Sequence, residues 1–181
     1  MYKRQPIRNA ELSETGLTTK DVKDDSRDDC PKFINQSPAH GSHGGGPFVI
    51  MPESSCDRIF AVVVKASSTI RKLFLIYKRE DGSTYTSAEA GETGGVFFVH
   101  VVGHNNVIDQ FATTFTNTVK FMRIRTVDKF TNQPVAFFEV GTNSGTHRQY
   151  AYGGNQVLGF YGEDGDRVNR LGALVYENND D

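Results

Sequence analysis

Histidines are the residues in this chain whose spacing most readily suggests chemistry. The five include two close pairs, His40 with His43 and His100 with His104, and a single His147. A zinc site uses three or four ligands in patterns such as Cys-x-x-Cys or His-Glu-x-x-His, and neither pattern occurs. His100 and His104 fall on an expected strand and the turn after it, not on one helix face. We expect no metal site and no cofactor, and we interpret the histidines as solvated or core-edge residues.

Serine, cysteine and carboxylate side chains support catalysis only in particular arrangements. No Gly-x-Ser-x-Gly elbow is present, and neither Cys30 nor Cys56 lies in a recognisable catalytic setting. Glu163, Asp164 and Asp166 cluster near the C-terminus, where they could bind a hard cation such as calcium or form an ordinary polar loop. We favour the polar loop. We therefore expect no catalytic residues, and a binding protein rather than an enzyme.

The glycine run Gly44-Gly45-Gly46 offers backbone rather than side-chain chemistry. A phosphate cradle made of backbone N–H groups needs a helix after the glycines, whereas Pro47 and an expected strand follow here. That interpretation is excluded. The run could still be a flexible hinge, or a loop that must come close to a ligand or to a neighbouring loop, which glycine permits because it lacks a β-carbon.

Charge and hydropathy narrow the class of partner. The net charge is -2 and the pI is about 6.2, so no strong field attracts nucleic acid. No apolar run approaches the roughly 20 residues that span a bilayer. The N-terminus lacks the apolar centre of a signal peptide, which leaves the compartment open: cytoplasmic, or secreted with a leader outside this sequence. Cys30 and Cys56 could pair or remain free thiols.

The first part of the chain differs in composition from the rest. Residues 1–40 contain few large apolar side chains and include a dense run of charges from Lys20 to Asp29. Such a segment buries too little apolar surface to offset the entropy of ordering. We expect a charged, disordered tail over residues 1–40 and one domain over residues 41–178.

After the tail, short runs of β-branched and aromatic residues alternate with Gly-rich turns, and no convincing helix appears. Asp81-Gly82 predicts a hairpin turn, because this pair readily adopts the left-handed geometry that such turns need. The pattern predicts an all-β barrel, sandwich or prism without a short-period repeat. The expected strands cover residues 48–50, 58–64, 70–77, 84–86, 96–102, 107–115, 119–127, 135–140, 156–161 and 171–176.

Three stretches of the chain carry a family resemblance. They are the Gly-rich opening at residues 43–48, the pair Gly94-Gly95 before an apolar strand, and the segment Gly159–Gly172. The last reads Gly-Phe-Tyr-Gly-Glu-Asp-Gly-Asp-Arg-Val-Asn-Arg-Leu-Gly. The corresponding segment in jacalin-type lectin domains reads roughly Gly-Phe-x-Gly-x-x-Gly-x-x-x-Asp-x-(Ile/Leu)-Gly. From about Gly41 to Glu177 the chain resembles a domain of that family.

The resemblance implies an all-β fold, namely a β-prism of three roughly four-stranded antiparallel sheets. It also implies a sugar site at one end, between the opening Gly-rich loop and the last loop. In such a site backbone N–H groups donate to sugar hydroxyls, and an Asp carboxylate accepts from two hydroxyls through charge-assisted bonds. The site residues that the resemblance implies here are Gly45, Gly46, Gly165, Asp166, Arg167 and Asn169.

The register of the last loop decides which residue replaces the family's carboxylate. Gly162–Asp166 also spells Gly-x-x-x-Asp, but counting back from Leu171-Gly172 places the motif on Gly165–Asn169. Asn169 keeps one acceptor oxygen and loses the charge, which costs about 1–2 kcal/mol. That cost corresponds to roughly five- to thirtyfold in affinity. Asp166, close by, is the carboxylate that could compensate.

We therefore expect a lectin that binds mannose or glucose weakly, with glycans or glycoproteins as partners and with a possible homo-oligomer. Galactose is less favoured, because the processed chain and the loop aromatic of the family's galactose binders are absent. The loop at residues 66–72 has no Gly and no Asp, so we expect no second sugar site there. The alternative is an interaction or scaffold protein that keeps the β-prism but binds no sugar.

Overall fold

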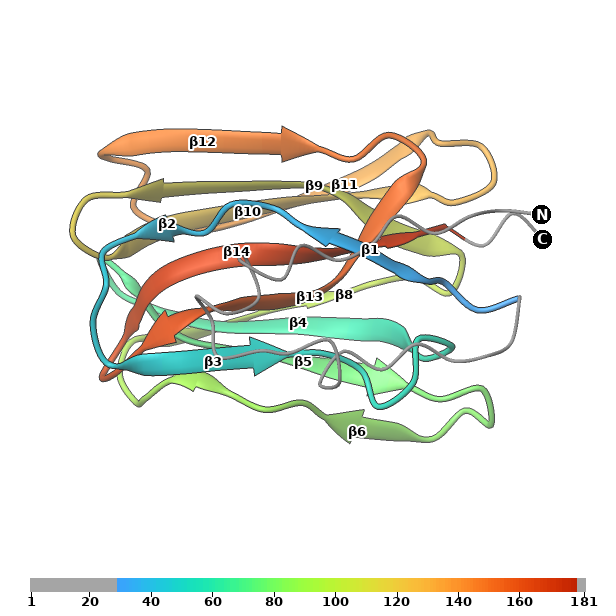
Figure 1. Ribbon diagram of the computed structural model, residues 1–181, viewed down its shortest axis with the longest axis horizontal. Coiled ribbons are helices and arrows are strands. Elements are labelled where there is room, and N and C mark those ends of the chain that lie inside the picture. Colours follow the sequence, from blue (N-terminus) through green and yellow to red (C-terminus); the bar gives the residue numbers. More distant parts are fainter. Residues whose placement is uncertain (1–28, 179–181) are drawn as a thin grey trace.

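The computed structural model describes residues 29–178, which form strands and turns with no helix. None of these residues belongs to a helix long and apolar enough to cross a membrane. Three antiparallel groups of strands surround a shared apolar core, and their long strands lie along roughly the same axis (Figure 1). The predicted all-β prism is thus confirmed.

The first sheet is formed by a contiguous stretch of the chain and has the order β6-β5-β4-β8, with β7 also paired to β5. Its strands are β4 (Arg58–Ala66), β5 (Ile70–Lys78), β6 (Thr84–Thr86), β7 (Ala90–Gly91) and β8 (Val96–Val101). The expected turn at Asp81-Gly82 joins β5 to β6, and Arg79 N–H donates to Ser83 O across 2.8 Å. Gly82 adopts a φ of 90°, as the hairpin geometry requires.

The second group of strands has the order β12-β9-β10-β11. Its strands are β9 (Asn106–Phe115), β10 (Val119–Asp128), β11 (Pro134–Gly141) and β12 (Thr146–Ala151). The sequence predicted the first three. It missed β12, whose residues Thr-His-Arg-Gln-Tyr-Ala are mostly exposed and show no apolar alternation.

The third group joins the two ends of the described chain. Its strands are β1 (Phe33–Gln36), β2 (His40–Gly41), β3 (Gly46–Ile50), β13 (Asn155–Asp164) and β14 (Val168–Glu177). β1 and β2 pair with β14, and β3 pairs with β13. One residue pair, Val157 with Ile108, links β13 to β9, so the second and third groups form one hydrogen-bonded sheet.

The core contains side chains from all three groups. Phe111 of β9 and Phe160 of β13 lie edge to face with ring centroids 5.5 Å apart, and both are fully buried. The buried Tyr77 of β5 donates its hydroxyl to Leu158 O across 2.7 Å, which satisfies its polar atom inside the core. Fully burying side chains of this size stabilises the fold by about 1.5–3 kcal/mol each.

The folded part starts before residue 41, where the sequence placed the domain boundary. Phe33 on β1 is fully buried and lies edge to face against Tyr176, with ring centroids 5.4 Å apart. The charged run before it hid this short strand, because the two apolar residues Phe33 and Ile34 do little to raise the mean hydropathy of a polar segment. Of the disordered tail expected over residues 1–40, residues 1–28 lie outside the described residues.

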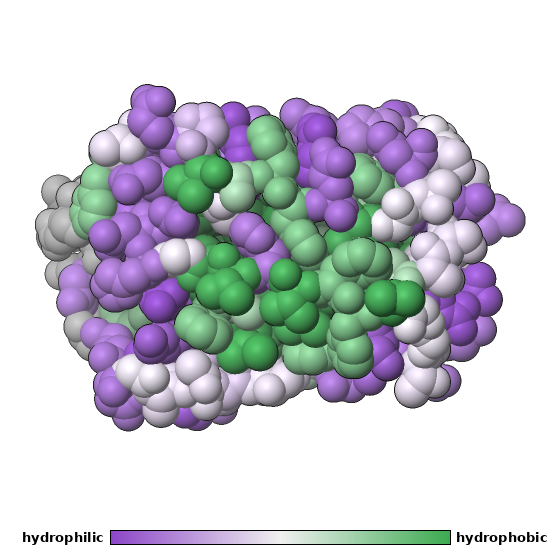
Figure 2. Space-filling model, turned by 180° about the vertical axis from the view of Figure 1, so that it is seen from behind, coloured by the Kyte–Doolittle hydropathy of each residue, from purple (hydrophilic) through white to green (hydrophobic). Residues whose placement is uncertain are grey.

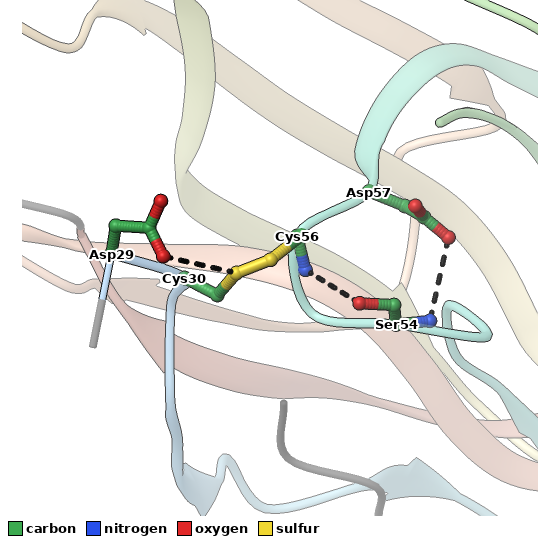
Figure 3. The surroundings of a disulfide bond; sticks show 5 residues. All are labelled: Asp29, Cys30, Ser54, Cys56 and Asp57. Carbon is green, nitrogen blue, oxygen red and sulfur yellow. Dashed lines mark hydrogen bonds between the residues drawn. A yellow bond between two sulfur atoms is a disulfide. The ribbon is translucent and has the colours of Figure 1, made fainter. Parts of the chain in front are cut away.

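A disulfide fixes this N-terminal segment to the loop after β3. Cys30 and Cys56 are bonded, with Cα atoms 4.7 Å apart, and they close a segment with a sequence separation of 26 (Figure 3). The N–H of Cys56 donates to Ser54 Oγ across 3.1 Å, which orders the loop around the bond. Loop closure of this length restricts the unfolded chain by about 3.5 kcal/mol. The sequence left open whether Cys30 and Cys56 pair or remain free thiols, and in the structure they are paired.

The three groups share a local motif that recurs at a regular interval of fifty residues. Gly41, Gly91 and Gly141 all have positive φ, and a Cβ on each would lie 2.0–2.1 Å from a carbonyl oxygen of an opposite strand. The oxygens belong to Asn169, Arg71 and Lys120, respectively. The next residue in each loop donates its N–H to the same oxygen, over 3.2, 3.1 and 2.8 Å for Ser42, Glu92 and Thr142. The repeat therefore lies in backbone geometry and not in the apolar pattern.

Candidate functional site

Strand pairing brings the opening glycine loop beside the last loop of the chain. β3 follows the glycine run and pairs antiparallel with β13, so that Gly46 lies opposite Asp164 and Pro47 lies opposite Glu163. The loop before β3 and the loop after β13 therefore meet at the same end of the prism. This arrangement joins residues more than one hundred positions apart in the sequence.

Gly45 makes this close approach possible. Its φ is 76°, and a Cβ there would lie 1.9 Å from the carbonyl oxygen of Asp164. A Cβ on Gly165, in the facing loop, would lie 3.9 Å from the Cα of Gly45. Of the two interpretations left open for the glycine run, the structure has the loop that must come close to a neighbouring loop.

Asn169 connects the two loops. It is the second residue of β14, it is half-buried, and its Nδ2 donates to the carbonyl oxygen of Gly44 across 3.1 Å. A Cβ on Gly44 would lie only 3.4 Å from that nitrogen. Among the described residues none donates to Oδ1 of Asn169, so this oxygen is available to accept from a ligand.

The loop between β13 and β14 provides backbone donors beside Asn169. Gly165 N–H donates to Arg167 O across 3.0 Å, which closes the turn. In the described part of the chain, the N–H groups of Asp166 and Arg167 donate to no acceptor. The side chains of these two residues form an exposed ion pair at 3.5 Å, a kind of contact that contributes at most about 1 kcal/mol.

The structure brings together five of the six site residues predicted from the sequence. Gly45, Gly165, Asp166, Arg167 and Asn169 lie in the two facing loops or at the start of β14. Gly46 instead begins β3, and a Cβ on it would meet no heavy atom within 4 Å. Gly44, which the sequence analysis did not include, is the residue in contact with Asn169. Aligning the glycine run with Gly91-Glu-Thr-Gly94 at the fifty-residue interval would have indicated it.

The carboxylates near the last loop each have a protein partner. Glu163 Oε2 lies 2.8 Å from Nδ1 of His43, whose Nε2 lies 2.8 Å from Nη1 of Arg170. If Nδ1 donates to Glu163, Nε2 is free to accept from Arg170, which corresponds to the neutral tautomer of the imidazole. Through these contacts the side chains of His43, Glu163 and Arg170 lie beside the sugar site predicted from the sequence.

Asp164 ties the third group of strands to the first sheet. Its Oδ2 accepts from the N–H of Gly91 across 2.6 Å. This carboxylate lies inside the alternative frame Gly162–Asp166 but faces a backbone donor of the protein. In the described part of the chain, no group of three His, Cys, Asp or Glu side chains is arranged to hold a metal ion.

The equivalent loop pair of the first sheet has a different side chain at the key position. Arg71 occupies the place of Asn169, and its guanidinium lies beside Gly94, where a Cβ would be 3.2 Å from Nε. Its Nη2 lies 3.5 Å from Thr93 O. The guanidinium of Arg71 therefore occupies, in the first sheet, the place that the amide of Asn169 occupies in the third group of strands. The absence of a sugar site in the loop at residues 66–72 remains a prediction.

A cavity of about 530 Å³ lies away from these loops, near the disulfide. Cys30, Arg58, His104 and Lys129 are among the residues that line it.

Comparison with known proteins identifies the family. The profile of the jacalin-like lectin domain matches residues 37–174, well over half of the chain. The chain is also similar in structure to Calystegia sepium agglutinin, with a TM-score of 0.65, 20% identity, and coverage of 78% of this chain and 95% of that one.

Two further lectin structures give similar values. The Calsepa lectin in complex with a biantennary N-glycan has a TM-score of 0.65 at 19% identity, covering 78% of this chain and 95% of the other. AcmJRL, a mannose-binding jacalin-related lectin from Ananas comosus, has a TM-score of 0.62 at 20% identity, covering 77% and 95%. At these identities the similarity establishes the fold. With the family match over residues 37–174, it follows that this chain belongs to the jacalin-like lectin family.

Proposed function

We propose that this protein is a non-catalytic lectin that binds mannose or glucose residues of glycans at the loops around Asn169. The observation that carries the proposal is the contact between Asn169 and Gly44, which holds two glycine loops together and leaves an amide oxygen available. Membership in a family of lectins supports binding rather than catalysis. AcmJRL is described as mannose-binding, and the Calsepa lectin was crystallised with an N-glycan, which supports this ligand class.

The available groups match what a sugar needs. A hydroxyl can donate one hydrogen bond and accept two, so a pair of neighbouring hydroxyls requires both donors and an acceptor. The N–H groups of Asp166 and Arg167 are the donors, and Oδ1 of Asn169 is the acceptor. The hydrogen bond from Gly165 N–H to Arg167 O closes the turn that carries these donors. Pre-organisation of this kind reduces the entropy cost of binding.

The affinity of the site is expected to be low. A neutral amide oxygen accepts a weaker hydrogen bond than a carboxylate, by about 1–2 kcal/mol. A single sugar ring carries mainly hydroxyl groups, so it buries little apolar area. A dissociation constant in the millimolar range corresponds to about −4 kcal/mol, which a few hydrogen bonds can supply.

A sugar titration followed by NMR tests the proposal. Methyl α-mannoside added to the ¹⁵N-labelled full chain should shift the amide signals of Gly44, Gly45 and residues 165–169 in a saturable manner. Methyl α-galactoside at the same concentrations is the matched control and should shift them less. Absence of saturable shifts at these residues with mannoside and glucoside up to high millimolar concentration would rule the proposal out.

One observation favours a second candidate, a scaffold protein that binds no sugar. Nδ2 of Asn169 already donates to Gly44 within the protein, so the side chain also has a purely structural role. In that case the β-prism would present other surfaces to a protein partner. The substitution of Asn169 described in the Discussion distinguishes the two candidates.

A further inference from the structure

Two features of the described residues lie outside the proposed sugar site. Figure 2 shows the first, a broad band of apolar residues across one side of the molecule. The second is the cavity of about 530 Å³ near the disulfide, which charged and polar side chains help to line. Charged groups define the chemistry of a ligand, whereas an apolar surface does not. The cavity is therefore the feature to which a ligand can be assigned.

The cavity lies at the end of the prism opposite the two glycine loops. Gln156 and Val157 line it, and they belong to the start of β13. Asp164, at the other end of the same strand, pairs with Gly46 beside the glycine run. Because β13 has ten residues, roughly 25–30 Å separate its two ends. A small molecule in the cavity therefore does not reach the loops around Asn169.

All three groups of strands contribute to the wall of the cavity. The first sheet supplies Arg58, at the start of β4, and Lys78, at the end of β5. The second group supplies Lys129, in the turn after β10, and the third supplies the start of β13. The disulfide between Cys30 and Cys56 also lines the cavity and joins two segments of its wall (Figure 3). Strand ends and a covalent bond thus hold the lining residues in position.

Two cations of this wall are paired across neighbouring strands. Arg58 lies directly opposite Lys78 in the register of β4 with β5. Both lie near the ring of Phe60, whose centroid is 5.9 Å from Cζ of Arg58 and 5.5 Å from Nζ of Lys78. Like charges in directly opposed positions repel each other and destabilise a strand pair. An anion bound beside both side chains would offset this repulsion.

The cations of the cavity are mostly without a counter-ion from the protein. Four lysine and arginine side chains line it, and one of them, Arg79, pairs with Glu53 at 3.0 Å. In the described part of the chain, Arg58, Lys78 and Lys129 have no carboxylate oxygen within 4.0 Å. Burial lowers the pKa of the Arg58 guanidinium, so this charge is partly desolvated as well as unpaired.

The other like-charged pair of the same two strands has a carboxylate partner. Lys65 lies opposite Lys72, and Nζ of Lys72 forms an ion pair with Oε2 of Glu89 at 3.0 Å. Nζ of Lys65 lies 4.3 Å from the ring centroid of Phe97, so this pair also has a neighbouring aromatic ring. Of the two like-charged pairs between β4 and β5, the one at the cavity is therefore the one that the described protein does not neutralise.

The carboxylates that line the cavity do not replace the missing counter-ion. Asp57 is buried, and its Oδ2 accepts from the hydroxyl of Tyr85. Asp29 and Glu80 are exposed to solvent. As stated above, none of these three carboxylates lies within ion-pair distance of the three unpaired cations. The wall of the cavity thus presents positive charge that a bound anion can neutralise.

We propose that the cavity binds the phosphate or sulfate group of a small molecule, with Arg58, Lys78 and Lys129 as the residues that hold it. A tetrahedral oxyanion has several acceptor oxygens, so it can accept from a guanidinium and from ammonium groups at once. The volume of about 530 Å³ is larger than one oxyanion and falls in the range of small-molecule sites. The group that carries the oxyanion fills the rest, and Val107 and Ile108 are apolar contacts for it.

An NMR titration of the ¹⁵N-labelled full chain tests the proposal. In Tris–chloride buffer at constant ionic strength, inorganic phosphate should shift the amide signals of Ile59, Asn106 and Lys129 in a saturable manner. The signals of Gly44 and Gly45 should not move. Inorganic sulfate is the second arm, and the tighter of the two anions identifies the preferred oxyanion. Phenyl phosphate is the third arm and should bind more tightly than inorganic phosphate, because its ring can contact the apolar part of the wall.

Single substitutions test which cations hold the anion. Arg58→Gln and Lys78→Gln should each raise the dissociation constant for phosphate at least about tenfold, because each removes a charge-assisted hydrogen bond. Lys65→Gln is the matched control. Lys65 also belongs to a like-charged pair of β4 and β5 and lies over an aromatic ring, but it does not line the cavity. This variant should bind phosphate as the unmodified chain does.

Thermal unfolding gives a second measurement, which also shows that the variants fold. Without phosphate, Arg58→Gln and Lys78→Gln should be at least as stable as the unmodified chain, because each relieves the repulsion between the opposed cations. Saturating phosphate should raise Tm of the unmodified chain, since a ligand that binds only the folded state stabilises it. The same addition should raise Tm of Arg58→Gln much less.

The absence of saturable shifts at the cavity residues, with phosphate and sulfate both at high millimolar concentration, would overturn the proposal. So would a dissociation constant that is unchanged in Arg58→Gln and Lys78→Gln, or one that rises equally in Lys65→Gln. Such a failure is distinguishable from a failure of the sugar proposal, because the mannoside titration is followed at Gly44, Gly45 and residues 165–169.

Discussion

The amide of Asn169 donates to the backbone carbonyl of Gly44 across 3.1 Å, and these two residues are 125 positions apart. The bond fixes the distance between the two loops that form the proposed sugar site. The same bond means that fold stability and sugar recognition favour different side chains at position 169. A carboxylate at position 169 would be the better sugar acceptor, but it could not donate to Gly44.

Replacing Asn169 by Asp should therefore change stability and affinity in opposite directions. The carboxylate places an acceptor against the Gly44 carbonyl, which costs about 1–2 kcal/mol of folding free energy and lowers Tm by roughly 2–8 °C. The charged acceptor should strengthen mannoside binding about five- to thirtyfold. Thermal unfolding and isothermal titration measure the two effects.

Asn169→Ala is the control for this substitution, and it should lose both the loop contact and the binding. If mannoside binds only after Asn169→Asp, the scaffold function is the better description of the unmodified chain. An affinity that does not rise in a folded Asn169→Asp variant would contradict the assigned site.

Gly45→Ala should destabilise the protein and disrupt the proposed site. The new Cβ would lie 1.9 Å from Asp164 O, in a backbone conformation with a φ of 76° that non-glycine residues adopt at a cost. We expect a loss of at least about 2 kcal/mol in unfolding free energy by urea denaturation. Gly46→Ala is the neighbouring control, because its Cβ would meet nothing within 4 Å. Equal losses in both variants would show that close approach is not the cause.

The disulfide should stabilise the fold without affecting the sugar site. Replacing both Cys30 and Cys56 by Ser should lower the unfolding free energy by about 3 kcal/mol and Tm by roughly 6–12 °C. The bond lies beyond the C-terminal end of β3, whereas Gly45 lies before its N-terminal end. The mannoside titration of the double variant should thus match that of the unmodified chain at 20 °C. Reductant alone should reproduce the loss of Tm in the unmodified chain.

Stability should decrease as the pH falls below about 6.5. Burial, together with Arg148 and Arg170, lowers the pKa of His40, which lies between the rings of Phe115 and Tyr150. Burial also lowers the pKa of His100, which stacks on Phe138. The unfolded chain then binds protons at a higher pH than the folded chain does, so their contribution is complete above pH 6.5 and declines below it.

Urea unfolding at pH 7.5, 6.5, 5.8 and 5.2 measures this dependence. The double variant His40→Gln, His100→Gln should show a smaller loss between pH 6.5 and 5.2 than the unmodified chain. If the unfolding free energy depends on pH identically in the two proteins, titratable groups other than His40 and His100 cause the effect.

The sequence predicted the long strands because their signal is local. β-branched and aromatic residues in β4, β5, β9 and β10 alternate or cluster between turn residues, and this pattern is independent of the rest of the chain. β12 was missed because an edge strand open to solvent needs no apolar residues. β1 was missed because a single buried aromatic, Phe33, anchors it.

The candidate site was only partly predictable for a different reason. The glycine spacing of the family pattern identified Gly45 and Gly165. Close backbone approach restricts position 45 to glycine, whereas a Cβ on Gly165 would make only ordinary contacts, at 3.8 and 3.9 Å. The contact of Asn169 with Gly44 depends on how β3 and β14 lie in the folded protein, which no local pattern encodes. The pairing of Cys30 with Cys56 likewise required the strand arrangement that brings the two residues together.

The loop pairs of the fifty-residue repeat share a backbone geometry but differ in their side chains. Gly41, Gly91 and Gly141 hold three loop pairs in the same conformation, while the residues beside them are Asn169, Arg71 and Lys120. A change at any of these three side chains leaves the glycines that shape the loop untouched. The shape of the three loop pairs and the charge that each of them presents are therefore set by different residues of the chain.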